Sequence, residues 1–217
     1  MRTIIIAAIV AAAPAAAFAQ STNAYVTGVG GFATSADGTS GNVLGEAGVK
    51  VAPHLFVFGD VGRFHDLEPS ELQPAVANAA STLSTIGVDV TGTSRVPAWY
   101  TTGGLRAQIP AGSRLMPYVF GSVGVARLTP EATFSYTSGT LGDSSLTPGE
   151  DVTSQVVSLG EFTQPPATSA LMVSGGAGVE APIARRVVLD ASYRYSRLNT
   201  DSPLHTQGLT FGVGYRF

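Results

Sequence analysis

Eight segments of about ten residues, rich in Val, Phe, Tyr and Gly, follow one another from Ala24 to Phe217. Polar and apolar residues alternate within most of them, and a period of two residues is typical of a β-strand with two unlike faces. A tilted strand of about 9–11 residues is long enough to cross the hydrocarbon of a bilayer. This recurrence predicts an all-β fold. The segments are Ala24–Thr34, Val43–Ala52, Leu55–Phe64, Ala98–Ile109, Met116–Leu128, Ser169–Ala181, Arg186–Leu198 and Thr206–Phe217.

The alternation separates charged from apolar side chains within single segments. In the seventh segment, Leu189 and Tyr193 lie on one face, and Asp190 and Arg194 lie on the other. A soluble barrel would keep such an apolar face inside, whereas a membrane barrel turns it towards lipid and points the charges into the lumen. The periodicity alone is compatible with either arrangement.

The connections between the segments fall into two classes of length. The stretches PH, PAGSRL and PIAR are short, whereas roughly 33 and 40 residues follow the third and fifth segments. Short turns on one side and long loops on the other are typical of bacterial outer-membrane barrels. Aromatic residues near the segment ends predict two interfacial girdles. We expect the short-turn girdle to contain Phe56, Phe58, Tyr118, Phe120, Tyr215 and Phe217, and the long-loop girdle Phe32, Phe64, Trp99, Tyr100 and Tyr195.

The first residues, MRTIIIAAIVAAAPAAAFAQ, have the layout of a secretory signal peptide. Arg2 provides a positive start, the apolar stretch is too short to span a bilayer, and small residues precede the expected cleavage site. We expect residues 1–19 to be removed after Sec export and residues 20–217 to form one barrel domain. Because Cys is absent, this domain folds without disulfides. With 12% charged residues and a single lysine, it lacks a basic surface for nucleic acid.

The last eight residues, TFGVGYRF, combine a polar Thr210, Gly212, an aromatic Tyr215 and a terminal Phe217. This ending resembles the C-terminal insertion signal of outer-membrane proteins. Together with PYVFGSVGVARL and VLDASYRYSRL, it makes the chain similar to the small OmpA-like and porin-family outer-membrane β-barrel domains. The resemblance implies an eight-stranded antiparallel up-and-down transmembrane β-barrel in the bacterial cell outer membrane. It also implies a monomer with periplasmic N- and C-termini, inserted by the barrel-insertion machinery.

Charged residues inside the predicted strands lie mostly opposite the apolar stripes. Because four acids and four bases are close to neutral together, we predict a paired ion network that fills the lumen. The interior of an eight-stranded barrel is about wide enough for side chains and little more. We interpret the network as structural and expect the lumen to conduct poorly. Its predicted members are Glu46, Lys50, Asp60, Arg106, Glu180, Asp190, Arg194 and Arg216.

The second long loop contains a predicted helix in the stretch SELQPAVANAASTLSTIG. Ser70 and Gln73 form a capping box, an apolar stripe follows at helical spacing, and a glycine ends the helix. We expect this short helix to cover the barrel mouth or to lean into it. In the third long loop we expect Tyr136, Val156 and Val157 to extend the flanking strands beyond the membrane.

The histidines and loop acids give little support to a catalytic or metal site. Asp201, Ser202 and His205 are close in sequence, but a nucleophile elbow, an H-E-x-x-H motif and a calcium-loop spacing are all missing from the sequence. We expect no enzymatic activity, cofactor or metal. The sequence favours a structural or surface-interaction role through the extracellular loops, with outer-membrane lipid and lipopolysaccharide as partners. The alternatives are a narrow channel for small solutes, an outer-membrane lipid-modifying enzyme and a soluble secreted barrel.

Overall fold

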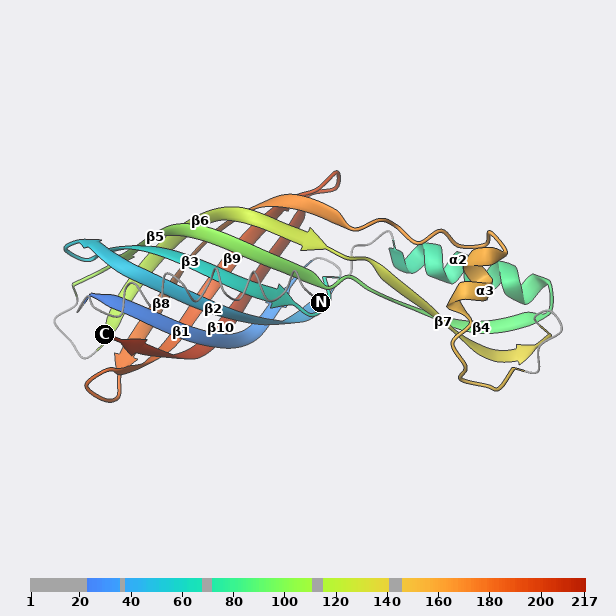
Figure 1. The fold of residues 1–217 in the computed structure, drawn as a ribbon, viewed down its shortest axis with the longest axis horizontal. Helices are drawn as coiled ribbons and strands as arrows, with labels where there is room; N and C mark the ends of the chain where they lie inside the picture. Colours follow the sequence, from blue (N-terminus) through green and yellow to red (C-terminus); the bar gives the residue numbers. More distant parts are fainter. Residues whose placement is uncertain (1–22, 36–37, 68–71, 111–114, 141–145) are drawn as a thin grey trace.

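The computed structural model describes residues 23–35, 38–67, 72–110, 115–140 and 146–217. The predicted signal peptide and Ser70 of the predicted capping box lie outside these residues. Figure 1 shows an elongated molecule with a barrel at one end and a smaller unit that projects beyond the other. The barrel strands are β1 (Ala24–Thr34), β2 (Thr39–Ala52), β3 (Leu55–Phe64), β5 (Ala98–Gln108), β6 (Met116–Leu128), β8 (Thr168–Pro182), β9 (Val187–Asn199) and β10 (Leu204–Arg216).

The eight strands form one closed antiparallel barrel in the order β1-β10-β9-β8-β6-β5-β3-β2. The last strand closes on the first, with Tyr25 opposite Arg216 and Thr34 opposite Gln207. All eight predicted segments are strands, and their ends differ from the prediction by a few residues at most. The predicted up-and-down barrel is therefore confirmed.

The outer wall of the barrel is apolar, as the alternation predicts. In β10, Phe211 and Val213 are 58% and 55% exposed, whereas Thr210 is 3% exposed and faces inward. An apolar outside with a polar inside is the arrangement of a barrel in lipid. The outward-facing large apolar residues of the barrel include Phe32, Val43, Val57, Val61, Trp99, Leu105, Val119, Val123, Val125, Leu171, Val173, Leu189, Tyr193, Tyr195, Leu209, Phe211, Val213 and Tyr215.

The predicted aromatic girdles are wrong for six residues, which point into the lumen. In β3, β5 and β6 these aromatics share a face with the charged residues Asp60 and Arg106, and successive side chains of a strand point to opposite faces. They are therefore inside the barrel, where most of them are nearly or fully buried. The inward aromatics are Phe56, Phe58, Phe64, Tyr100, Tyr118 and Phe120.

Three tyrosines of the inner face lie over a glycine on a neighbouring strand. Each tyrosine is directly opposite its glycine in the register, and a Cβ atom on that glycine would collide with the phenol ring. The missing side chain is thus what lets a large ring lie flat against the wall of a narrow barrel. The pairs are Tyr25 with Gly48, Tyr100 with Gly62, and Tyr118 with Gly178.

A second, two-stranded sheet forms the core of the projecting part. β4 (Val88–Arg95) leads into β5, β7 (Glu131–Gly139) continues β6, and the two strands pair antiparallel. α2 (Leu72–Thr85) packs against β4, and α3 (Thr153–Ser158) packs against β7. We call these four elements the distal unit. Figure 1 shows the distal unit beyond the end of the barrel.

The predicted helix of the second loop is confirmed, but its expected position at the barrel mouth is wrong. Its buried stripe, from Leu72 to Leu83, packs instead on the sheet of the distal unit, because that sheet offers the helix an apolar face. Tyr136 lies in β7, which extends β6 as expected, whereas Val156 and Val157 belong to α3 and not to a strand. Within the described part of the chain, no helix is long and apolar enough to cross a membrane.

Candidate functional site

Arg106 of β5 lies at the centre of the charged residues in the lumen. Its guanidinium nitrogens are 2.7 Å from Glu180, 3.1 Å from Glu46 and 3.4 Å from Asp190. The arginine side chain is 3% exposed. Because these partners belong to β2, β8 and β9, one buried cation connects four strands across the barrel.

Two tyrosine rings hold the same guanidinium. Its central carbon is 3.4 Å from the ring centroid of Tyr118 and 5.0 Å from that of Tyr25, within the range of cation–π interactions. The Tyr25 hydroxyl donates to Glu46 at 2.5 Å, and the Tyr118 hydroxyl donates to Asp190 at 2.8 Å. The tyrosines therefore position the carboxylates that face Arg106. Sequence reasoning missed both, although they share the inner face with the predicted charges.

Two further arginines extend this network along the lumen. Arg194 lies 2.8 Å from Asp60 and 3.8 Å from Glu46, so Glu46 faces two guanidiniums. Arg216, the last residue of β10, pairs with Glu180. The ion pairs thus bring seven of the eight predicted lumen residues into one connected set.

Lys50 is the predicted residue that the structure leaves outside this set. It is exposed at the end of β2, where the pairing with β3 shifts between Lys50 and Ala52. Among the described residues, no ion pair involves it. Its predicted place in the network is wrong, because the strand reaches its turn here and the ammonium extends into solvent. Four carboxylates and three guanidiniums remain in the lumen.

The half of the lumen nearer the distal unit is filled, mostly by large apolar side chains, together with a few buried polar ones such as Asn42 and Ser196 that are hydrogen-bonded to neighbouring strands. Phe64, Tyr100, Met172 and Leu198 are each at most 2% exposed, and they belong to a single core cluster. The rings of Phe64 and Tyr100 lie 4.9 Å apart. The same cluster continues through Leu67 into the distal unit. The barrel mouth is therefore closed by packed side chains of the strands themselves.

A cavity of about 10 Å³ lies within the charged half of the lumen. This is close to the smallest volume that holds one water molecule. Its lining includes Arg106, Asp190 and Arg194 of the network, together with Thr27 and Thr210. With ion pairs around this cavity and apolar side chains beyond it, the barrel is a filled cylinder.

The distal unit presents a face rich in hydroxyl groups. Thr91 and Thr93 of β4 and Thr137 of β7 are exposed on the side of the sheet opposite α2, and the hydroxyls of Thr91 and Thr137 are 3.3 Å apart. At the barrel end of this face, Arg95 pairs with Glu131 at 2.7 Å. The stretch VDVTGTSR alternates clearly, and this signal could have identified β4 from the sequence.

Asp89 joins α2 to the sheet of the distal unit. Its carboxylate accepts hydrogen bonds from Ser138 of β7 at 2.7 Å and from Ser84 of α2 at 2.9 Å. These hydrogen bonds, first from Ser138 and then from Ser84, favour the charged form and lower the pKa of Asp89 below its ordinary value. The charged carboxylate therefore fixes the end of the helix on the sheet.

The three residues considered for catalysis lie at the rim of the barrel. His205 faces outward from β10, where its Nδ1 is 2.6 Å from the hydroxyl of Tyr195, and the two rings stack. Asp201 and Ser202 are exposed in the turn between β9 and β10. Among the described residues, no group of three or more His, Asp or Glu side chains could hold a metal ion.

The residues of the predicted insertion signal lie on both faces of β10 and, for Phe217, directly after its last residue. Thr210 is buried inside the barrel with its hydroxyl 2.8 Å from that of Ser192, and Gly212 shares its face. Tyr215 and Phe217 lie at the short-turn end with their ring centroids 5.1 Å apart. Their role in insertion stays a prediction.

A closed eight-stranded barrel with an apolar outer wall and a charged, filled lumen defines the class of integral outer-membrane barrels. The chain belongs to the outer membrane protein beta-barrel domain family, whose family model matches residues 4–217. It is a protein of the bacterial outer membrane, as its family is.

Solved structures of outer-membrane barrels have a similar fold, and two of them serve as examples. Neisserial surface protein A is 15% identical, with 89% of this chain and 96% of that chain covered and a TM-score of 0.53. A major outer membrane protein from Thermus thermophilus is 11% identical, with 89% of this chain and 99% of that chain covered and a TM-score of 0.54. At these identities the likeness concerns the fold alone. The comparison with curated protein sequences gave no match.

Proposed function

We propose that this protein is a non-conducting outer-membrane barrel that presents a folded interaction unit at the cell surface. The observation that carries the proposal is the apolar core inside the distal unit, where Leu83, Val88, Phe134 and Val156 are each at most 2% exposed; this core is continuous with the apolar cluster of the barrel mouth. A loop that only closed the barrel mouth would not need an apolar core that extends beyond the barrel. A core of this kind holds an exposed surface in a fixed shape, which lowers the entropy cost of binding.

The filled lumen supports this role over that of a narrow channel for small solutes. A channel needs an open, continuous polar path, whereas one half of this lumen is occupied by paired charges and the other half by packed apolar side chains and hydrogen-bonded polar ones. Opening such a path would break several buried ion pairs at once, and breaking even one costs about 3–5 kcal/mol.

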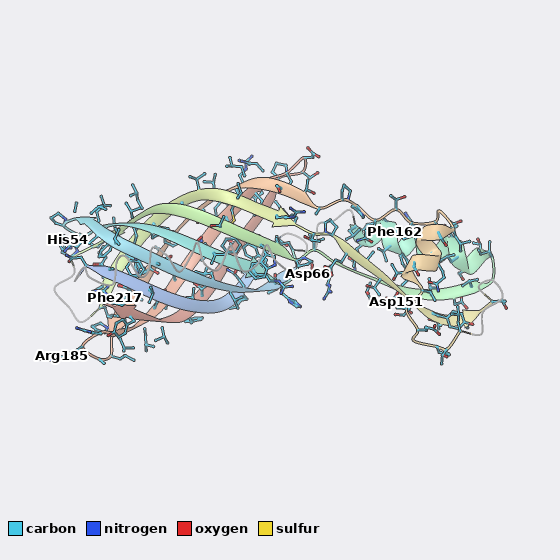
Figure 2. The ribbon with its side chains drawn as sticks, viewed as in Figure 1. His54, Asp66, Asp151, Phe162, Arg185 and Phe217 are labelled. Carbon is cyan, nitrogen blue, oxygen red and sulfur yellow. The ribbon has the colours of Figure 1, made fainter. Side chains whose placement is uncertain are left out.

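The proposed orientation places the distal unit outside the cell and the short turns in the periplasm. Outer-membrane barrels generally keep their short turns on the periplasmic side. In Figure 2, His54, Arg185 and Phe217 lie at one end of the molecule, and Asp151 and Phe162 lie at the other end, beside the elements of the distal unit. With this orientation both termini are periplasmic, which fits Sec export through residues 1–19 and insertion through the C-terminal signal.

The orientation is tested by cysteine labelling, because the natural chain contains no cysteine. Ile86, which is 63% exposed at the end of α2, and Arg185, exposed at a short turn, are replaced by cysteine one at a time. A membrane-impermeant maleimide should label Ile86→Cys in intact cells and label Arg185→Cys only after the outer membrane is permeabilised. The reverse pattern would overturn the orientation.

The interaction role is tested with cells that carry either the whole protein or a variant with short Gly-Ser connectors in place of residues 67–96 and 129–167. Fluorescent cells are applied to an array of purified glycans and extracellular-matrix proteins. The proposal is supported if cells with the whole protein bind a component of the array and cells with the variant do not. Binding no stronger than that of cells without the protein, over the whole array, contradicts it. A mobility shift on boiling shows whether the variant barrel has folded.

A further inference from the structure

Arg63, Trp99 and Arg127 form a row across three adjacent strands on the outer wall of the barrel. Arg63 of β3 is directly opposite Trp99 of β5, which is directly opposite Arg127 of β6. Residues directly opposite in a β-ladder point to the same face. Trp99 is 58% exposed on the outer wall, so the two arginines on either side of it also project from that wall.

The row lies at the long-loop edge of the apolar outer wall. Arg63 and Arg127 are the penultimate residues of their strands at the long-loop end, and Trp99 is the second residue of β5. Val61 and Val125 lie on the same strands as the two arginines, two positions closer to the middle of the barrel. They face outward and are 42% and 55% exposed. Tryptophan and arginine at this level are typical of the boundary between hydrocarbon and lipid headgroups.

The two arginines of the row differ in their partners from most of the other strand arginines; among the described residues, Arg197 of β9 also has no ion pair. Arg106 and Arg194 are ion-paired in the lumen, and Arg95 is paired in the distal unit. In the part of the chain that the structure describes, no ion pair involves Arg63 or Arg127. Their charge is therefore not balanced by the protein.

Arg63 is held in place while its hydrogen-bonding capacity remains unused. Its guanidinium carbon is 5.5 Å from the centroid of the Trp99 ring, at cation–π distance. Its Nε atom is buried and has no hydrogen-bond partner.

We propose that Arg63 and Arg127 bind the phosphate groups of a phosphorylated glycolipid of the outer leaflet, with Trp99 packed against its sugar and acyl-chain boundary. The strands that carry the arginines are two strand spacings apart, about 10 Å. Long guanidinium side chains at that spacing can hold one phosphate between them or two phosphates of one headgroup, and arginine binds phosphate through paired hydrogen bonds. The proposal rests on the orientation given under Proposed function, which puts this rim in the outer leaflet.

The site is tested with the full-length protein in detergent, titrated with purified lipopolysaccharide. Trp99 is the only tryptophan of the chain, so its fluorescence reports directly on the site. The variant Arg63→Gln/Arg127→Gln keeps the fluorophore and should bind lipopolysaccharide at least about tenfold more weakly, because charge-assisted hydrogen bonds are lost. Arg185→Gln, with the same loss of charge at the opposite rim, should bind like the wild type.

Two further titrations identify the ligand chemistry. Dephosphorylated lipopolysaccharide should bind the wild type as weakly as intact lipopolysaccharide binds the double variant. Inorganic phosphate alone should leave the Trp99 emission unchanged. Equal binding by the wild type and the double variant, equal binding of the dephosphorylated lipid, or a full response to inorganic phosphate would each overturn the proposal. Because the experiment is done in detergent, it can fail while the cysteine labelling still supports the orientation, and the reverse is also possible.

Discussion

Replacing Arg106 by leucine should strongly destabilise the barrel. The leucine removes the cation that lies 2.7–3.4 Å from carboxylate oxygens of Glu46, Glu180 and Asp190, so three buried acids would face one another in the lumen. An acid left without its partner in such a site is far more costly than the loss of the pair itself.

The size of the effect follows from the burial of the pair. Breaking a buried ion pair by removing one partner costs about 3–5 kcal/mol of unfolding free energy. The contacts with the rings of Tyr25 and Tyr118 are lost in the same variant, and a desolvated cation–π contact contributes about 2 kcal/mol. These contributions are coupled through shared partners and do not add, so we expect a loss of about 3–5 kcal/mol in total.

The assay is urea unfolding of the purified protein in detergent, followed by the fluorescence of Trp99. Arg95→Leu is the matched control, because its ion pair with Glu131 joins side chains that are 58% and 40% exposed. An exposed pair of this kind contributes about 0–1 kcal/mol. Unfolding of both variants at the same urea concentration would refute the structural role of the lumen network. Adding Asp190→Asn to Arg106→Leu should recover part of the loss, since Asp190 has no other ion-pair partner among the described residues and one uncompensated charge is removed.

Three other changes test separate parts of the structure. Leu83→Ala should cost the distal unit about 2–5 kcal/mol and make it sensitive to protease, while the boiling-dependent mobility shift of the barrel persists. Because the pKa of Asp89 is lowered, its stabilisation is complete above the ordinary aspartate pKa of 3.8 and is lost as the pH falls through the lowered value. Asp89→Asn should therefore make the distal unit more susceptible to protease at neutral pH. Equal protease resistance of the wild type and the variant at neutral pH would contradict this. Gly62→Val should reduce the yield of folded barrel in a refolding gel, because a side chain there collides with Tyr100.

The barrel could be predicted from the sequence because each strand carries its own signal. Alternation of the kind seen in β10, with Phe211 and Val213 on one face and Thr210 on the other, depends only on neighbours along the chain. The length difference between turns and loops separated the two ends of the barrel. Local patterns of this kind survive in any tertiary context that has a lipid side and a lumen side.

The facing of the aromatics was harder to predict, because one end of β3 is apolar on both faces. Phe56 and Phe58 alternate with Leu55 and Val57, so apolar periodicity does not separate the inside from the outside there. Asp60 lies an even number of residues from both phenylalanines and therefore shares their face of the strand. This charged residue is the signal that places them in the lumen. A side chain in place of the glycine opposite each tyrosine would collide with the ring. This constraint can be seen only once the pairing of the strands is known.

The distal unit could not be assembled from the sequence, because its pairing is between distant segments. β4 and β7 lie on opposite sides of the β5–β6 hairpin in the chain, and Val90 pairs with Tyr136 across it. The helical stripe that ends at Leu83 was recognised, but its partner was not. An amphipathic helix without a known partner is naturally assigned to the nearest open surface, which here was the barrel mouth.

The closed lumen is the central claim, and planar-bilayer recording of the full-length protein tests it most directly. After insertion is verified by the mobility shift of the reconstituted protein, we predict a membrane current no different from that of a protein-free bilayer, with no sustained conductance steps. Stable steps whose size or ion selectivity changes in Arg106→Leu would contradict the claim, because ions would then pass through the site that the network fills.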